Sequence, residues 1–388
     1  MLCALTEGLV GQIFQGILIL LSLYFAVYAN SKYELPIYFK ALNILLVLFT
    51  IYGASLLVSG EQYIVKETGW KIANTEFLKS IYESLLPIYS FYVFTKQGLL
   101  KESTIKLWFF IFLLLAIRSF YRTQERLLIE AIERGSSAEE FTNNTGYVFL
   151  ALLPALVLFY EKPVIQYLGI AVCAYFIVIA MKRGAVIVGV VCLLWFMFAN
   201  LERVPKKRKW IVVLVSLAMV FAGFFLYRYM METSDYFRYR ITQTKDGDSS
   251  GRNELFSVFY KHFVYENNPF RFLFGYGANA TLRIGQNFAH NDWLEIATNQ
   301  GLLGLVVYLV YWICFFVSWQ RAKWHPQAFM AIGMVFIIYF YTTLFSMSYN
   351  SVSRCSAMVL GYYLAVSFET PSEDEEVEEE DMETEQLS

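Results

Sequence analysis

The stretch AHNDWLEIATNQGLLGL, residues 289–305, carries one of only three histidines in the chain. His290 stands just before a pattern typical of a helix start, because Asp292 is followed three positions later by Glu295, which fits a capping box. The positive end of a helix dipole favours a neutral imidazole, which can accept a proton from a hydroxyl group. His290 is therefore a candidate general base, and a structural histidine at a membrane surface is the alternative interpretation.

A second candidate is Arg252, which follows a Ser-Ser-Gly turn. Leu255, Phe259 and Phe263 recur after it at helical spacing, so a short surface helix is expected to begin near Arg252. A guanidinium in a first helical turn, next to free backbone donors, could bind a phosphate group. A solvated arginine in a helix cap is the alternative.

Lys182 and Arg183 form a basic pair between two long apolar stretches, in VIAMKRGAVIVGV. The sequence leaves room only for a tight turn there, so the pair is expected close to the bilayer surface or in a polar cavity. Snorkelling side chains or a topological anchor would explain the pair without any catalytic role.

Other patterns favour no metal or nucleotide chemistry. Asp246 and Asp248 in KDGDSSG could belong to a metal-binding loop, but the further spaced ligands of a calcium loop are missing, and a solvated turn is favoured. The glycines of FGYGAN, 274–279, lack the spacing of a nucleotide fingerprint and indicate a turn that allows close packing. The five cysteines show no CxxC pairing, so neither a disulfide framework nor a zinc site is predicted.

The elements that must position these residues are membrane helices. Among the 388 residues, 57% are apolar and only 16% charged, which is typical of a polytopic membrane protein and not of a soluble domain. About 20 apolar residues cross a bilayer, and we expect an all-α fold of about 11 transmembrane helices (10–12). Their centres are expected near residues 20, 47, 87, 114, 153, 172, 191, 219, 310, 336 and 360.

The domain organisation follows from these spans and from the basic residues. VPKKRK at 204–209 is assigned to the cytoplasm by the positive-inside rule. Residues 1–228 are expected to hold helices 1–8, residues 229–300 a large helical loop on the outer side with the candidate site residues Arg252 and His290, and residues 301–368 helices 9–11. The acidic segment 369–388 is expected to be a disordered cytoplasmic tail.

The ordered set of motifs resembles the bacterial O-antigen ligase/polymerase superfamily, which are integral membrane glycosyltransferases. A histidine-asparagine motif, a glycine-leucine-x-x-glycine start of the next span and two arginines at particular places carry the resemblance. Here these residues are His290 with Asn291, then Gly301, Leu302 and Gly304, together with Arg183 before Gly184 and Arg252 after Ser250 and Gly251. The alignable part is about residues 163–319, and the rest is similar only in hydropathy.

The resemblance implies a type C membrane glycosyltransferase-like fold, located in the inner membrane with its active site on the periplasmic side. It implies transfer of a glycan from an undecaprenyl pyrophosphate carrier, inverting and without metal or other cofactor. The acceptor would be a hydroxyl group of another lipid-linked repeat unit in a polymerase, which we favour, or of the lipid A core in a ligase.

The resemblance also assigns roles to residues. His290 would be the general base, and Arg183 and Arg252 would stabilise the pyrophosphate leaving group. Lys182, Asn291 and Glu295 would bind substrate or support the site. A chain-length regulator is a further candidate partner.

Functions of other classes stay open at the level of sequence. A transporter or flippase of lipid-linked sugars would share the hydropathy and the cations, although internal repeats and midplane charges typical of transporters are not evident. A structural assembly partner is the third interpretation. Basic patches with interleaved aromatic residues suited to nucleic acid are absent from the sequence.

Overall fold

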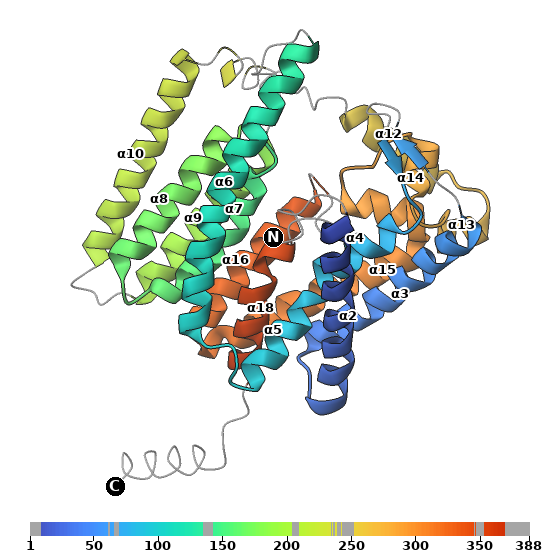
Figure 1. Cartoon of the computed structure of the whole chain (residues 1–388), viewed down its shortest axis with the longest axis horizontal. Coiled ribbons are helices and arrows are strands. Elements are labelled where there is room, and N and C mark those ends of the chain that lie inside the picture. Colours follow the sequence, from blue (N-terminus) through green and yellow to red (C-terminus); the bar gives the residue numbers. More distant parts are fainter. Residues whose placement is uncertain are drawn as a thin grey trace.

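The computed structural model describes residues 9–60, 63–65, 70–134, 143–203, 209–233, 252–344, 346 and 353–368, and four isolated positions between 235 and 242. This part of the chain is an all-α membrane protein with one short β-hairpin (Figure 1). The predicted basic segment at 204–208, the aspartates at 246 and 248 and the acidic tail lie outside the described residues.

Long helices make up most of the structure. They are α2 (Leu9–Lys32), α3 (Ile37–Ser59), α6 (Glu102–Arg134), α9 (Arg183–Arg203), α10 (Lys209–Thr233), α15 (Asp292–Arg321) and α16 (Pro326–Thr343). The shorter ones are α4 (Glu76–Leu85), α5 (Pro87–Lys96), α7 (Gly146–Leu152), η2 (Leu153–Phe159), α8 (Pro163–Ile179), α12 (Arg252–Val264), α13 (Pro269–Phe274), α14 (Ala280–Ile284), η4 (Ala322–Trp324) and α18 (Ser353–Ser367).

Proline fixes several of the helix starts. The helices α5, α8, α13 and α16 each begin with a proline. Its backbone dihedral suits the first helical position, and the N–H group it lacks would have no partner there. Pro87 therefore divides the apolar stretch centred near residue 87 into α4 and α5, which have ten residues each.

Within the described residues, six helices are long and apolar enough to cross a membrane: α2, α3, α6, α9, α15 and α16. Three shorter apolar helical segments, Gly146–Phe159, Pro163–Ile179 and Ser356–Ser367, add to them. The expected class, a polytopic all-α membrane protein, is confirmed. The number of eleven spans stays a prediction.

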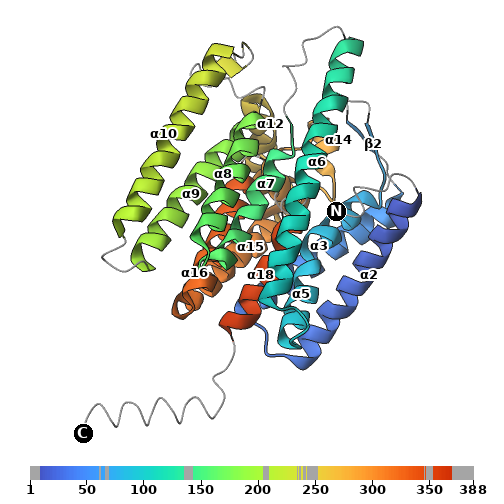
Figure 2. The same ribbon diagram turned by 60° about the vertical axis from the view of Figure 1, so that its left-hand side comes forward.

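The bundle is held by pairs of helices distant in sequence. α15 packs against α3, α16 against α9 and α18, and α5 against both α18 and α2. Aromatic rings fill much of the space between them; for example, the Tyr38 ring of α3 lies 4.7 Å from that of Phe315 in α15. α10 stands at one edge beside α9 in both views (Figures 1 and 2).

The short helices α12, α13 and α14 gather at the end of the bundle where α15 begins, which we call the site end (Figure 1). The hairpin of β1 (Tyr63–Val65) and β2 (Trp70–Ile72) lies there too, and Ile72 packs with Leu282 of α14. The strands are antiparallel, with Tyr63 opposite Ile72.

Candidate functional site

The start of α15 is fixed by Asn291. The Asn291 side chain caps the helix, because its Oδ1 accepts from the backbone N–H of Leu294 at 3.1 Å. The predicted capping box of Asp292 and Glu295 is therefore wrong by one position, since Asp292 is already helical. Asn291 takes the cap because its short amide reaches the third helical N–H, which leaves both carboxylates for other partners.

Glu295 ties the segment before α15 to the helix. Its carboxylate is fully buried and accepts from the Thr281 hydroxyl at 2.5 Å, the Ala289 backbone N–H at 2.9 Å and the Asn299 amide at 3.1 Å. A buried carboxylate needs several donors to offset its lost hydration. These three donors come from α14, from the residue before His290 and from α15, so Glu295 holds the backbone on which His290 is mounted.

His290 itself has an unusual backbone conformation. Its φ angle of 51° lies in the left-handed region, which costs a non-glycine residue on the order of 1 kcal/mol and is found most often at functional positions. This geometry holds the imidazole, half-buried, between the end of α14 and the start of α15. The neighbouring Ala289 bond to Glu295 and the Asn291 cap keep the backbone in place on both sides.

Two cations act on His290. Burial first, and then the Arg252 guanidinium and the Lys182 ammonium, lower the pKa of His290 from 6.5 to about 4. Arg252 is the first residue of α12, as the sequence predicts, and Lys182 precedes α9. The structure therefore brings together two candidate cations that are 70 positions apart, and it places them beside a neutral imidazole.

Arg183 begins α9 directly after Lys182. The pair stands in a tight turn between α8 and α9, as predicted, with Met181 in the left-handed region at φ 54°. The positive end of the dipole of this 21-residue helix adds to the positive potential of the pair.

Asn143 anchors the turn that carries this basic pair. Its backbone N–H donates to the Ala180 carbonyl at 3.1 Å, and its side chain donates to the Phe120 carbonyl of α6 at 3.1 Å. Its Oδ1 accepts from both the backbone and the hydroxyl of Thr145, which lies at the start of α7. Asn143 thus connects α6, α7 and the α8–α9 turn, and the sequence analysis missed it.

Tyr147 is a second residue that the sequence analysis missed. Tyr147 is the second residue of α7, and the charge of Arg252 acts on its hydroxyl group. A polar residue pattern, TNNTGY at 142–147, was the available signal, but nothing in it indicates that α12 lies beside α7.

A break in α15 lies nine residues after its start. Gly301 has non-helical dihedrals (φ 67°, ψ −156°), as the predicted interruption at Asn299, Gln300 and Gly301 requires. Carbonyl groups that the break leaves without helical partners accept from elsewhere: Thr298 from the Tyr276 N–H at 3.0 Å, and Asn299 from the Gly277 N–H at 2.9 Å. The turn predicted for FGYGAN is therefore confirmed, and its backbone packs against α15.

The described residues hold no group of three or more His, Cys, Asp or Glu side chains that could bind a metal. Beside burial, the charges of Arg252 and Lys182 lower the pKa of His290. Such a site can attract an anion, stabilise negative charge that develops on it, and accept a proton at a neutral imidazole.

A comparison with known families decides the relationship. Residues 168–309 match the family described as O-Antigen ligase. This segment, less than half of the chain, is similar to that family. The match confirms the resemblance to the O-antigen ligase/polymerase superfamily over this segment, and it supports a ligase- or polymerase-type function. No curated protein matches the chain.

The matched segment, residues 168–309, contains every residue that the sequence predicts for the site. Lys182 and Arg183 lie near its start, Arg252 in its middle, and His290, Asn291 and Glu295 near its end. The catalytic and supporting roles of these residues stay predictions.

Proposed function

We propose that this membrane protein is a glycosyltransferase of the polymerase type. It moves a glycan from undecaprenyl pyrophosphate to a hydroxyl group of another lipid-linked repeat unit, on the periplasmic side of the inner membrane, with inversion and without a metal. The observation that supports this most directly is the meeting of Arg252 and Lys182 at His290. Transfer requires cations that stabilise the lipid pyrophosphate leaving group and a neutral base that accepts the proton of the acceptor hydroxyl, and both must lie at the same site.

In the proposed reaction the acceptor oxygen attacks the anomeric carbon of the donor glycan. The bond from that carbon to the pyrophosphate oxygen breaks, and the lipid pyrophosphate leaves with the electron pair. Arg252 and Arg183 stabilise the negative charge that develops on the leaving oxygen. The hydroxyl proton goes to the imidazole of His290, and Asn291 and Glu295 hold that imidazole in position.

The same cations make donor binding a condition for deprotonation of the acceptor. Without donor, burial and the two cations together hold the pKa of His290 at about 4, so the imidazole is neutral but a weak base. A pyrophosphate bound between Arg252 and Lys182 would compensate their charge, and the pKa of His290 would then rise. A base whose pKa lies nearer to the working pH transfers protons more effectively. Donor binding therefore prepares His290 for the acceptor hydroxyl group.

Transfer to the lipid A core is the second candidate function. The matching family is described as O-Antigen ligase, which favours this alternative by name. Donor, cations and base would be the same, and only the acceptor would differ.

The test is in vitro transfer by purified full-length protein from a defined undecaprenyl pyrophosphate oligosaccharide, in buffer with a chelator. A ladder on the carrier supports the polymerase, and product found only on added lipid A core supports the ligase. His290→Ala should lower transfer by about 10²- to 10⁴-fold. His262→Ala, in the same loop, is the matched control and should keep activity.

Two results would overturn the proposal. Full activity of a folded His290→Ala variant would show that His290 is not the general base. Movement of the lipid across liposomes without any transfer product would make the protein a transporter.

A further inference from the structure

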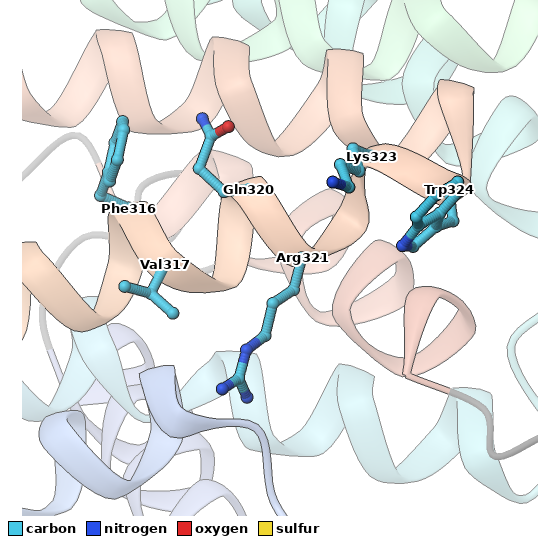
Figure 3. A pocket seen from close by; sticks show the side chains of 6 residues that line it. All are labelled: Phe316, Val317, Gln320, Arg321, Lys323 and Trp324. Carbon is cyan, nitrogen blue, oxygen red and sulfur yellow. The ribbon is translucent and has the colours of Figure 1, made fainter.

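A groove at the far end of α15 has no part in the proposed reaction. Its volume is about 490 Å³, and α15 and η4 line it (Figure 3). The lining residues are Phe316, Val317, Gln320, Arg321, Lys323 and Trp324.

The groove lies at the membrane surface opposite His290. From the break at Gly301 to Arg321, α15 continues for 20 residues, which is a rise of about 30 Å. This length matches the hydrocarbon core of a bilayer. Arg321 and Lys323 therefore lie at the level of lipid headgroups, and Phe316 and Val317 lie about one turn deeper, at the level of acyl chains.

The outer part of the groove is cationic. Arg321 and Lys323 are exposed, and neither makes an ion pair with any described residue. The Lys323 ammonium lies 4.9 Å from the ring centroid of Trp324, which is 79% exposed. Every lining residue is basic, neutral polar or apolar, so the groove offers an anion two charges and one amide.

The inner part of the groove is apolar. Val317 and Arg321 project from the same side of α15, while Phe316 and Gln320 project from another (Figure 3). Each side thus carries an apolar residue one turn deeper than a polar one. Phe316 is 45% exposed although it lies within the membrane span. A ligand that matches this order has an anionic head and an apolar chain.

We propose that this groove binds an anionic glycerophospholipid of the leaflet opposite His290. Its phosphate contacts Arg321 and Lys323, its glycerol region lies beside Trp324, and an acyl chain covers Phe316 and Val317. Interfacial tryptophan and basic residues suit such a ligand. The acidic segment 373–385 offers charge but only Val377 and Met382 as apolar side chains for the inner part, so it fits the groove less well.

The test measures lipid retained by the purified full-length protein with native mass spectrometry, after mixing with phosphatidylglycerol or phosphatidylcholine. The wild type should retain phosphatidylglycerol at least fivefold better. The double variant Arg321→Gln/Lys323→Gln should lose about fivefold for each charge removed. Arg321→Lys/Lys323→Arg, which keeps both charges, should retain the lipid.

The matched control removes two exposed lysines from the same membrane surface, Lys32→Gln/Lys40→Gln. Their location follows from α3, whose Tyr38 N–H donates to the Ser318 hydroxyl of α15 at 3.2 Å. This control should stay within twofold of the wild type. Equal loss in both double variants would mean a diffuse surface effect and would overturn the proposal.

Three further outcomes would also overturn it. Equal retention of the two lipids would remove the anionic preference. A more than fivefold gain of lipid on deletion of residues 369–388 would make the acidic segment the occupant. Displacement of phosphatidylglycerol by undecaprenyl phosphate at much lower concentration would assign the groove to the carrier lipid. Since lipid retention is read without any transfer reaction, failure here leaves the proposed glycan transfer untouched.

Discussion

The two halves of α15 differ in the polarity of the side chains that they bury. The polar half, Asp292–Gln300, buries Asp292, Glu295, Thr298, Asn299 and Gln300, whereas the aromatic half, Leu302–Arg321, buries Tyr308, Tyr311, Trp312, Phe315 and Trp319. Gly301 separates them.

The difference between the halves lies in what covers them. Short helices α12, α13 and α14 contact α15, and Thr281 of α14 and the turn after α13 donate hydrogen bonds to its polar half. Rings of α3 and α16 pack against its aromatic half. Hydrogen bonds, which require particular directions, fix the packing around the polar half, whereas close packing of apolar side chains fixes the packing around the aromatic half. We therefore expect mutations in the polar half to affect transfer, and mutations in the aromatic half to affect stability alone.

Gly301→Ala should have the largest effect on stability. A Cβ there would lie 2.5 Å from the Gly275 nitrogen, and the positive φ adds strain. We expect a loss of about 3 kcal/mol or more, as large as other changes that strain or overpack a structure. Thermal unfolding in detergent measures it.

Two other glycines separate the causes of this loss. Gly277 has φ +98° but open space around it, so Gly277→Ala should cost only the strain, about 1 kcal/mol. Gly223 has open space and an ordinary helical backbone, and Gly223→Ala should cost nothing. Equal unfolding temperatures for all three variants would contradict the close backbone contact of α13 and α15.

Glu295→Gln should have the next largest effect. One carboxylate oxygen becomes an NH₂ group, which leaves the Ala289 N–H or the Thr281 hydroxyl without an acceptor in a buried place, at a cost of about 1–3 kcal/mol. Because the His290 backbone loosens, transfer should fall more than stability alone explains. Thr281→Val removes one donor only and should show a smaller loss of both. Unchanged transfer activity of Glu295→Gln, at a temperature where it is fully folded, would show that this carboxylate does not position His290 for transfer.

In the aromatic half, Phe315→Leu should cost about 1 kcal/mol of stability, because the ring loses its contacts with Tyr38 and Phe336 while most apolar volume remains. The transfer rate at a temperature well below unfolding should match that of the wild type. A tenfold loss of transfer would show that the aromatic half also controls the site.

The smallest expected effect is that of pH on kcat/KM, which reports the free protein. With a His290 pKa of about 4, the imidazole stays neutral between pH 8 and pH 5.5, so kcat/KM should change by less than about twofold. An ordinary histidine would lose about tenfold over that range. The acid limb of kcat should lie at higher pH, since bound donor compensates Arg252 and Lys182.

The free energy of unfolding should also depend on pH through His290, and it should fall as the pH falls. The folded pKa lies below the ordinary 6.5, so the unfolded chain binds more protons between these values. The contribution of neutral His290 is present above pH 6.5 and is lost as pH falls towards 4. His290→Gln should flatten this part of the pH-stability curve.

Much of the site could be predicted from residue types. The helix start after His290, the turn before Arg252 and the basic pair that contains Lys182 single these residues out in the sequence, and in the structure Arg252 and Lys182 both lower the pKa of His290. The helix start at Arg252 and the break at Gly301 follow from local turn and glycine preferences, which neighbouring residues decide. Asn143 and Tyr147 could not be found, because their partners Phe120 and Arg252 are distant in the sequence.

The sequence by itself determined the membrane class, the all-α fold and the candidate base and cations, because hydropathy, helix start and stop signals and residue chemistry are local properties of the chain. The tertiary structure alone decided that Asn291 caps α15, that Glu295 anchors the His290 backbone, and that α7 and the α8–α9 turn lie beside α12. These outcomes depend on which donor, distant in the sequence, comes within hydrogen-bond distance of a buried acceptor. The packing of the helices decides this.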